Sequence, residues 1–102
     1  MKKILELIIE PNSRKRKEFS QTLSKLAETL QSSCSSLTID ESEDGSTINM
    51  VTEWDSVDQK CRVLRIEAFE ILSGAIAALC EKVVIRLNGK IIGRDISKLK
   101  TL

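Results

Sequence analysis

The chain of 102 residues contains no histidine. This absence excludes Ser-His-Asp and Cys-His nucleophile pairs, an imidazole general base, and any metal or haem site that needs a histidine ligand. The three cysteines, Cys34, Cys61 and Cys80, cannot all pair with one another, and none stands in a Cys-x-x-Cys arrangement. We therefore expect neither a zinc ribbon nor a dithiol redox site. The odd number of thiols and the lack of an export signal favour a cytoplasmic protein.

Aromatic residues and net charge are also scarce. The aromatic side chains are Phe19, Trp54 and Phe69. Because 16 basic residues balance 15 acidic ones and few rings are available for base stacking, the sequence argues against a nucleic-acid partner. The apolar run Ile4–Ile9 is short and is interrupted by Glu6, so we expect no membrane span. Hydrophobic residues at 41% and charged residues at 30% predict one ordinary globular domain.

Hydrophobic periodicity predicts four strands and two helices. Alternating apolar residues predict strands at 4–10, 37–40, 47–54 and 83–87. Apolar residues at helical spacing predict one helix at about 14–31, capped by Asn12 or Ser13, and a second from Ser56 to about Leu79. The order βαββαβ predicts a ferredoxin-like α+β fold, an antiparallel sheet with two helices on one face.

Two dipeptides predict tight turns. Asp44-Gly45 is expected to join the second and third strands, and Asn88-Gly89 favours a type I′ turn because both residues tolerate a positive φ. Such a turn would place Leu87 opposite Lys90, Arg86 opposite Ile91, and Ile85 opposite Ile92. We divide the chain into a domain over residues 1–89 and a C-terminal strand or arm over residues 90–102. The apolar residues of this arm need a surface, either beside its own sheet or across a dimer partner.

The two faces of the predicted sheet differ in polarity. One face is apolar and should meet the helices; it carries Leu5, Leu7, Ile9, Leu37, Ile39, Ile48, Met50, Val83, Ile85 and Leu87. The opposite face mixes apolar side chains with Glu6, Asn49, Glu53 and Arg86. Because this face is too apolar to be left bare, we expect it to pair with a second copy of the chain. The monomeric alternatives are an ACT-like ligand sensor and an RNA-recognition module, although the latter needs aromatic residues on the open face.

The junction between the third strand and the second helix carries a more specific pattern. Val51-Thr52-Glu53-Trp54-Asp55-Ser56 resembles the Glu-Trp-x-Ser junction of the antibiotic biosynthesis monooxygenase family. Ser33-Cys34-Ser35-Ser36-Leu37 resembles the Pro-Gly-Cys segment that leads into the second strand of that family. The resemblance covers residues 3 to 88. It implies a ferredoxin-like domain that pairs as a dimeric α+β barrel, and therefore a homodimer.

The resemblance also implies an activity. It points to a cofactor-independent monooxygenase that acts on a small aromatic substrate, such as a quinol or a polyketide-like phenol, with no metal or organic cofactor. The nearest counterparts of the family's catalytic residues are Asn49, Trp54 and Arg86. Val63 stands where the family usually has a histidine, and five residues rather than four separate Asn49 from Trp54, which puts them on opposite sides of a regular strand. The alternative is a non-catalytic dimeric ligand-binding or regulatory module of the same fold.

Each candidate residue also has a structural interpretation, which we favour. Trp54 either fills the core beside the second helix or lines a pocket for a flat substrate. Arg86 belongs either to an ion-pair cluster at the dimer interface or to a pocket in which it holds a carboxylate or phenolate. The basic run Arg14–Lys17 is either solvated or an anion site at the helix N-terminus. The cysteines are interpreted as small hydrophobic residues, with Cys34 the most exposed of the three.

Overall fold

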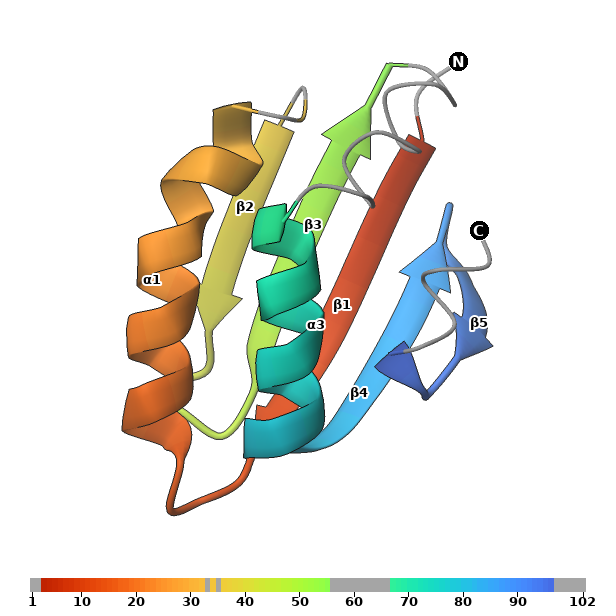
Figure 1. The fold of residues 1–102 in the computed structure, drawn as a ribbon. Helices are drawn as coiled ribbons and strands as arrows, with labels where there is room; N and C mark the ends of the chain where they lie inside the picture. The colour runs from red at the N-terminus through yellow and green to blue at the C-terminus, as the bar shows by residue number, and fades with distance from the viewer. Residues whose placement is uncertain (1–2, 33, 35, 56–66, 97–102) are drawn as a thin grey trace.

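One antiparallel sheet organises the whole molecule. The structure, a computed structural model, describes residues 3–32, 34, 36–55 and 67–96. The elements are β1 (Lys3–Pro11), α1 (Arg16–Ser32), β2 (Ser36–Glu41), β3 (Ile48–Trp54), α3 (Glu67–Leu79), β4 (Cys80–Leu87) and β5 (Lys90–Gly93). The strands lie in the order β2-β3-β1-β4-β5 (Figure 1). The predicted ferredoxin-like α+β fold is confirmed, with β5 as an extra edge strand.

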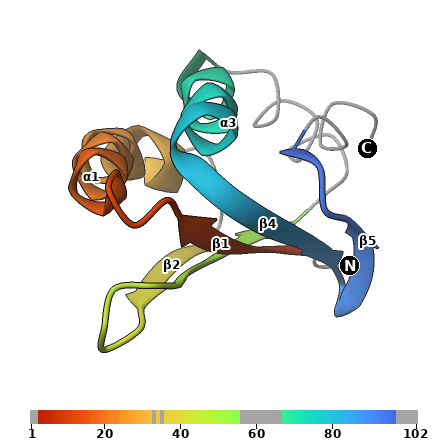
Figure 2. The ribbon, with the colours of Figure 1, turned by 90° about the horizontal axis from the view of Figure 1, so that it is seen from below.

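Both helices cover the same face of the sheet (Figure 2). The residues that fill the space between the layers come from the three central strands and the two helices; the largest fully buried ones are Trp54, Phe19, Leu5, Leu7, Ile9, Leu30, Met50, Leu72 and Ile85. The predicted apolar face is therefore the core face. Ile39 shares this face through its pairing with Met50, but it stays 36% exposed because β2 is an edge strand. Among the described residues, no helix is both long and apolar enough to cross a membrane.

The pairing of β1 fixes the positions of all the candidate residues. This strand pairs antiparallel with β3 from Lys3–Trp54 to Ile9–Ile48 in an unbroken register. It pairs on its other edge with β4, where a bulge lies between Glu10 and Pro11. Because β3 is regular along its whole length, side chains five positions apart on it point to opposite faces of the sheet.

Two predicted element boundaries are shifted by local hydrogen bonds. Helix α1 begins at Arg16 rather than Arg14, because the Asn12 side chain accepts a hydrogen bond from the Arg14 N–H and the Asn12 carbonyl accepts one from Lys15. Strand β4 begins at Cys80, three residues earlier than predicted, so α3 passes directly into it. The Asn12 N–H donates to the carbonyl of Leu79 and fixes this junction.

The β4–β5 hairpin confirms the predicted turn and corrects its register. Asn88 and Gly89 have φ values of 51° and 83°, as a type I′ turn requires. Leu87 lies opposite Lys90 and Arg86 opposite Ile91, but Ile85 lies opposite Gly93 and not Ile92. The extra residue in β5 makes a bulge that turns Ile92 toward the hydrophobic core. Residues 90–93 therefore lie beside their own sheet.

The environment of Cys34 contradicts the predicted exposure of this thiol. Cys34 is 9% exposed, and its S–H donates to the carbonyl of Leu30, 2.7 Å away. The last turn of α1 supplies this acceptor, which holds the side chain under the helix end. The predicted helix start at Ser56–Gln59, together with Cys61 and Val63, lies outside the described residues.

Candidate functional site

Trp54 lies at the carboxyl end of β3, on the helix face of the sheet. Its side chain is 0% exposed, and it is the largest of the fully buried side chains. The indole Nε1 is buried as well, and within the described part of the chain it has no hydrogen-bond partner. A buried tryptophan N–H normally finds an acceptor, so an indole N–H without one among the described residues is an unusual feature.

Asn49 lies on the opposite, open face of the sheet. It stands between Ile8 of β1 and Asp40 of β2, and its side-chain oxygen is buried without a partner among the described residues. An amide oxygen in such a place can accept one further hydrogen bond from a ligand or from another chain.

Arg86 lies on the open face too, directly opposite Glu6 in the sheet. One guanidinium nitrogen lies 3.3 Å from the Glu6 carboxylate, and another donates to the Gly89 carbonyl at 3.3 Å. The two charged side chains are 38% and 23% exposed, so the ion pair is only partly shielded from water. This ion pair joins two of the side chains that the sequence predicts in a cluster on this face.

The structure does not bring the three candidate residues together. Asn49 and Arg86 share one face, but β1 lies between their strands and the two positions are offset by two residues. Strand geometry then separates their Cα atoms by about 12 Å. Trp54 faces the other way, because β3 contains no bulge that could repair the five-residue spacing. A single chain therefore offers an indole N–H on one side of the sheet and an amide and a guanidinium on the other.

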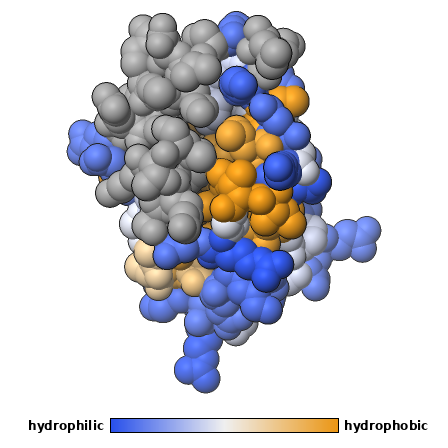
Figure 3. Space-filling view, turned by 90° about the vertical axis from the view of Figure 1, so that its right-hand side faces the viewer, coloured by the Kyte–Doolittle hydropathy of each residue, from blue (hydrophilic) through white to orange (hydrophobic). Residues whose placement is uncertain are grey.

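Two neighbouring pockets at the β4–β5 corner are a feature that the sequence reasoning missed. Their volumes are about 460 Å³ and 400 Å³, and they share Glu81, Lys82, Val83 and Arg94 as lining residues. Figure 3, which looks onto the β5 side of the molecule, shows apolar surface exposed among hydrophilic side chains. The sequence carries no signal for these pockets, because the apolar run Val83–Leu87 and the segment Lys90–Arg94 after the turn have the same length.

Neither described cysteine is set up as a nucleophile. Burial raises the pKa of the Cys80 thiol to about 11 and also raises the pKa of Cys34. Both thiols are free and stay protonated near neutral pH. Within the described ranges, no group of three or more His, Cys, Asp or Glu side chains could hold a metal ion.

The basic start of α1 is partly neutralised by its neighbours. Lys15 forms an ion pair with Glu18 at 3.4 Å, and Arg16 donates to the Asp44 carbonyl at 3.3 Å. These contacts support the interpretation of the basic run as a solvated surface.

Comparison with solved structures identifies the fold. Rv0793 from Mycobacterium tuberculosis is similar over 85% of this chain and 92% of its own, with a TM-score of 0.78 and 13% sequence identity. PA3566 from Pseudomonas aeruginosa matches with a TM-score of 0.77 and 18% identity over 84% of this chain and 90% of its own. An antibiotic biosynthesis monooxygenase matches with a TM-score of 0.75 and 14% identity, over 85% of this chain and 95% of its own.

The chain has an antibiotic biosynthesis monooxygenase-like fold. The resemblance at the Trp54 junction is thus confirmed at the level of the fold. Another similar structure, from Bacteroides thetaiotaomicron, is described as a possible oxidoreductase; it has 15% identity and a TM-score of 0.75 over 84% of this chain and 94% of its own. No model of a known protein family and no curated protein matches the sequence.

Proposed function

We propose that this protein is a cofactor-independent monooxygenase that oxidises a small aromatic substrate of the quinol or polyketide-like class. In the reaction, an activated ring CH₂ and O₂ give a ring carbonyl and water. One oxygen atom enters the substrate, the other leaves as water, and the substrate supplies all four electrons. Because the substrate anion reduces O₂ directly, the protein has to supply desolvation, orientation and a group that stabilises negative charge.

The observation that carries this proposal is the buried indole N–H of Trp54, which has no hydrogen-bond partner among the residues that the structure describes. It lies in the interior on the helix face of a sheet whose fold is that of the monooxygenase structures. A hydrogen-bond donor in a desolvated place stabilises a developing phenolate or enolate more strongly than a donor in water. We assign Trp54 to the substrate oxygen. The other two proposed site residues, Asn49 and Arg86, lie on the open face, on the other side of the sheet.

The open face supports a second part of the proposal, a homodimer. Ile4 is 37% exposed and Ile91 55%, and both lie on this face beside the Glu6–Arg86 ion pair. This face carries exposed isoleucines and a buried amide oxygen that has no partner in the described part of the chain, so it gains by packing against a second sheet. We place this dimer in the cytoplasm, where the free thiols of Cys34 and Cys80 would stay reduced.

Oxygen uptake tests the proposed activity. The purified protein is mixed with hydroquinones and with anthrone-like phenols, and O₂ consumption is followed with and without a metal chelator. We expect uptake that survives chelation and falls by about tenfold or more in Trp54→Phe, which loses the donor but keeps a ring. Phe69→Leu is the matched control, since Phe69 is 3% exposed and carries no polar atom. Equal losses in both variants would refute a role for the indole N–H.

Oligomeric mass tests the proposed dimer. Light scattering should give about twice the chain mass of 11.4 kDa at micromolar concentration. Val51→Lys places a charge in the middle of the open face and should produce a monomer. Ile71→Lys makes the same type of change at a residue of α3 that is 47% exposed and should remain dimeric. A stable wild-type monomer would refute the dimer.

The alternative function is a non-catalytic dimeric module that binds a ligand or a regulator. The separation of Trp54 from Asn49 and Arg86, and the engagement of Arg86 by Glu6, favour this alternative. A wild-type protein that dimerises and binds aromatic compounds but consumes no O₂ with any of them would establish it.

A further inference from the structure

A pocket of about 250 Å³ lies between α1 and the edge strand β2, on the helix side of the sheet. Helix α1 lies over β2 at this edge (Figure 2). The residues that line the pocket come from the helix and from the two outer strands; they are Ser20, Leu23, Ser24, Ala27, Ile39, Glu41 and Ile48. Glu41 pairs with Ile48, and Ile39 pairs with Met50, so the strand residues of the pocket all point to the core face. Helix and strand side chains therefore meet across a single layer.

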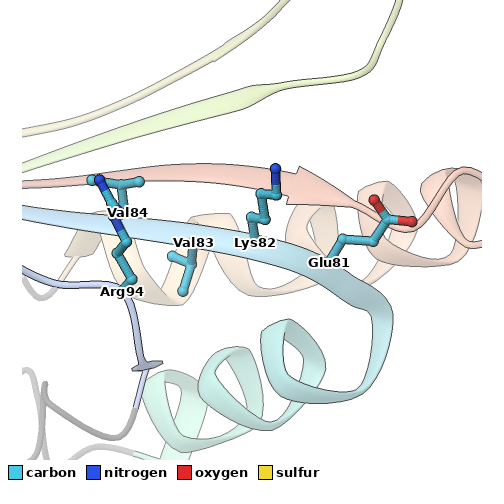
Figure 4. A pocket seen from close by; sticks show the side chains of 5 residues that line it. All are labelled: Glu81, Lys82, Val83, Val84 and Arg94. Atoms are coloured by element: carbon cyan, nitrogen blue, oxygen red, sulfur yellow. The ribbon is translucent and has the colours of Figure 1, made fainter.

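The pockets at the β4–β5 corner are built differently, because their lining residues come from both faces of the sheet. Figure 4 shows Lys82 and Val84 on one side of β4 and Val83 on the other. A small ligand cannot contact both groups through the strand. The pocket between α1 and β2 has no such division, so one ligand can reach all of its walls.

Small side chains on one flank of α1 leave this pocket unfilled. Ser20, Ser24 and Ala27 follow one another at helical spacing and lie on the same side of the helix. Opposite them, Ile39 stays 36% exposed although it points to the core face, and Ile48 forms the floor beside it. The result is an apolar surface that the helix does not cover, with room for a ligand somewhat smaller than those of typical pockets, whose volumes are about 300–1,000 Å³.

A carboxylate stands at one end of this apolar surface. A Cβ on Gly45 would lie 3.4 Å from Glu41 Oε1, so the Glu41 side chain lies against the turn that follows β2. Within the described part of the chain, this carboxylate forms neither an ion pair nor a hydrogen bond. Arg16 reaches the same turn but donates to the Asp44 carbonyl. Ile39 and Glu41 are two positions apart, or about 7 Å, which is close to the length of an aryl ring that carries an aminomethyl group.

The positive side chains of α1 lie outside the pocket. Lys17 and Lys25 line a neighbouring hollow on the outer flank of the helix, beyond Ser20 and Ser24. An anion would meet these lysines without touching the apolar surface, whereas a cation inside the pocket meets Glu41. An ionised carboxylate forms its strongest hydrogen bonds with charged donors such as an ammonium group. The pocket is therefore suited to a positively charged group on an apolar body.

We propose that the pocket between α1 and β2 binds small organic ammonium ions, with Glu41 holding the ammonium group and the wall formed by Ala27 and Ile39 holding the apolar body. The site does not depend on the proposed monooxygenase activity. Ile48 and Trp54 stand at opposite ends of β3, six residues or about 20 Å apart. The two proposals can therefore fail independently.

Titration of the full chain with benzylamine hydrochloride, followed by backbone amide NMR at physiological salt, tests this site. We expect a dissociation constant on the order of 1–10 mM and the largest shifts at Ser24, Ile39 and Glu41. Glu41→Gln should weaken binding by about threefold, since an exposed charge pair is partly screened by water. Glu43→Gln is the matched control: it removes the same charge from an exposed residue nearby that does not line the pocket, so the affinity should not change.

Filling the pocket tests the apolar half of the site. Ala27→Leu should weaken benzylamine binding by about tenfold or more, because the larger side chain occupies the space of the ring. Ser24→Leu, at an exposed position of α1, fills the same space and provides the test if Ala27→Leu does not fold. Ala78→Leu makes the same type of change at an exposed position of α3 and should bind like the wild type.

Further probes separate the charge from the apolar body. Benzyl alcohol, which has the ring without the charge, should bind about threefold more weakly than benzylamine, and methylammonium, which has the charge without the ring, about tenfold more weakly. Benzoate should also bind more weakly than benzylamine. The assignment would be overturned by benzyl alcohol, methylammonium or benzoate binding as tightly as benzylamine, by unchanged affinity in Glu41→Gln or in both filling variants, or by shifts centred away from α1 and β2.

Discussion

Asn88 combines two stabilising roles, and a short series of substitutions separates them. Its backbone has a φ of 51°, which costs an ordinary L-residue about 1 kcal/mol more than it costs asparagine or glycine. Its side-chain oxygen also accepts a hydrogen bond of 2.9 Å from the N–H of Ile4, which ties the β4–β5 turn to the start of β1. A hydrogen bond of this kind contributes about 0.5–1 kcal/mol, because the pair is exposed to water.

The magnitudes predict an ordered series for the free energy of unfolding. Asn88→Ala loses both contributions and should cost about 2 kcal/mol, or about 8–16 °C in melting temperature for a domain of this size. Asn88→Gly accepts the positive φ and loses only the hydrogen bond, so it should cost about 1 kcal/mol or less. Asn88→Asp keeps the acceptor and should stay close to the wild type. Urea denaturation at pH 7 measures all three.

Two outcomes would refute this reasoning about Asn88. Equal destabilisation by alanine and glycine would show that the backbone conformation contributes nothing and that the hydrogen bond carries the whole effect. A wild-type stability for alanine would show that neither the turn geometry nor the contact with Ile4 stabilises the fold.

Three further predictions address the core, the hairpin loop and the thiols. Leu7→Ala removes a side chain that is 1% exposed from the central strand and should cost about 2–5 kcal/mol in urea unfolding, while Ile71→Ala at the surface should cost less than about 0.5 kcal/mol. Hydrogen bonds from the Ser46 hydroxyl, the Ser46 N–H and the Ser42 hydroxyl lower the pKa of Asp44 from 3.8 to about 2. The Asp44 carboxylate therefore contributes stability above pH 4, and this contribution is lost as the pH falls toward 2. In acid unfolding curves, the difference in stability between wild type and Asp44→Asn should become smaller over that pH range. The raised pKa values of Cys34 and Cys80 predict that, in a Cys61→Ser background, both thiols react with a disulfide reagent at pH 8 at least about tenfold more slowly in the folded protein than in urea.

The fold was predictable because its patterns are local and consistent. Apolar and polar residues alternate in the segments that become β1 and β3, and this pattern predicts both the strands and their buried face. The helical spacing of Phe19, Leu23 and Leu30 does the same for α1. The turn at Asn88-Gly89 was predictable because few residues accept a positive φ. Each of these signals depends on neighbours within a few positions.

The errors came from contacts that no pattern in the sequence encodes. The burial of Cys34 depends on the Leu30 carbonyl at the end of α1, and the early start of β4 depends on a hydrogen bond from Asn12. The bulge in β5 depends on the packing of Ile92 against the core, which no turn rule encodes. The opposite orientations of Asn49 and Trp54 followed from their spacing, but the pockets at the β4–β5 corner depend on where one strand stops beside another.

The central position of β1 has a consequence for the order in which the fold can be completed during synthesis. Leu5 pairs with Thr52 on one edge and with Leu87 on the other, 82 residues further along the chain. At about 5–20 residues per second, a ribosome takes about 4–16 s to add those residues. During this interval the apolar strand β1 has one edge, and at first both edges, without its native partner. The glutamates at positions 6 and 10 then have a further role. Their charges, in a strand that is still unpaired, oppose its association with other nascent chains.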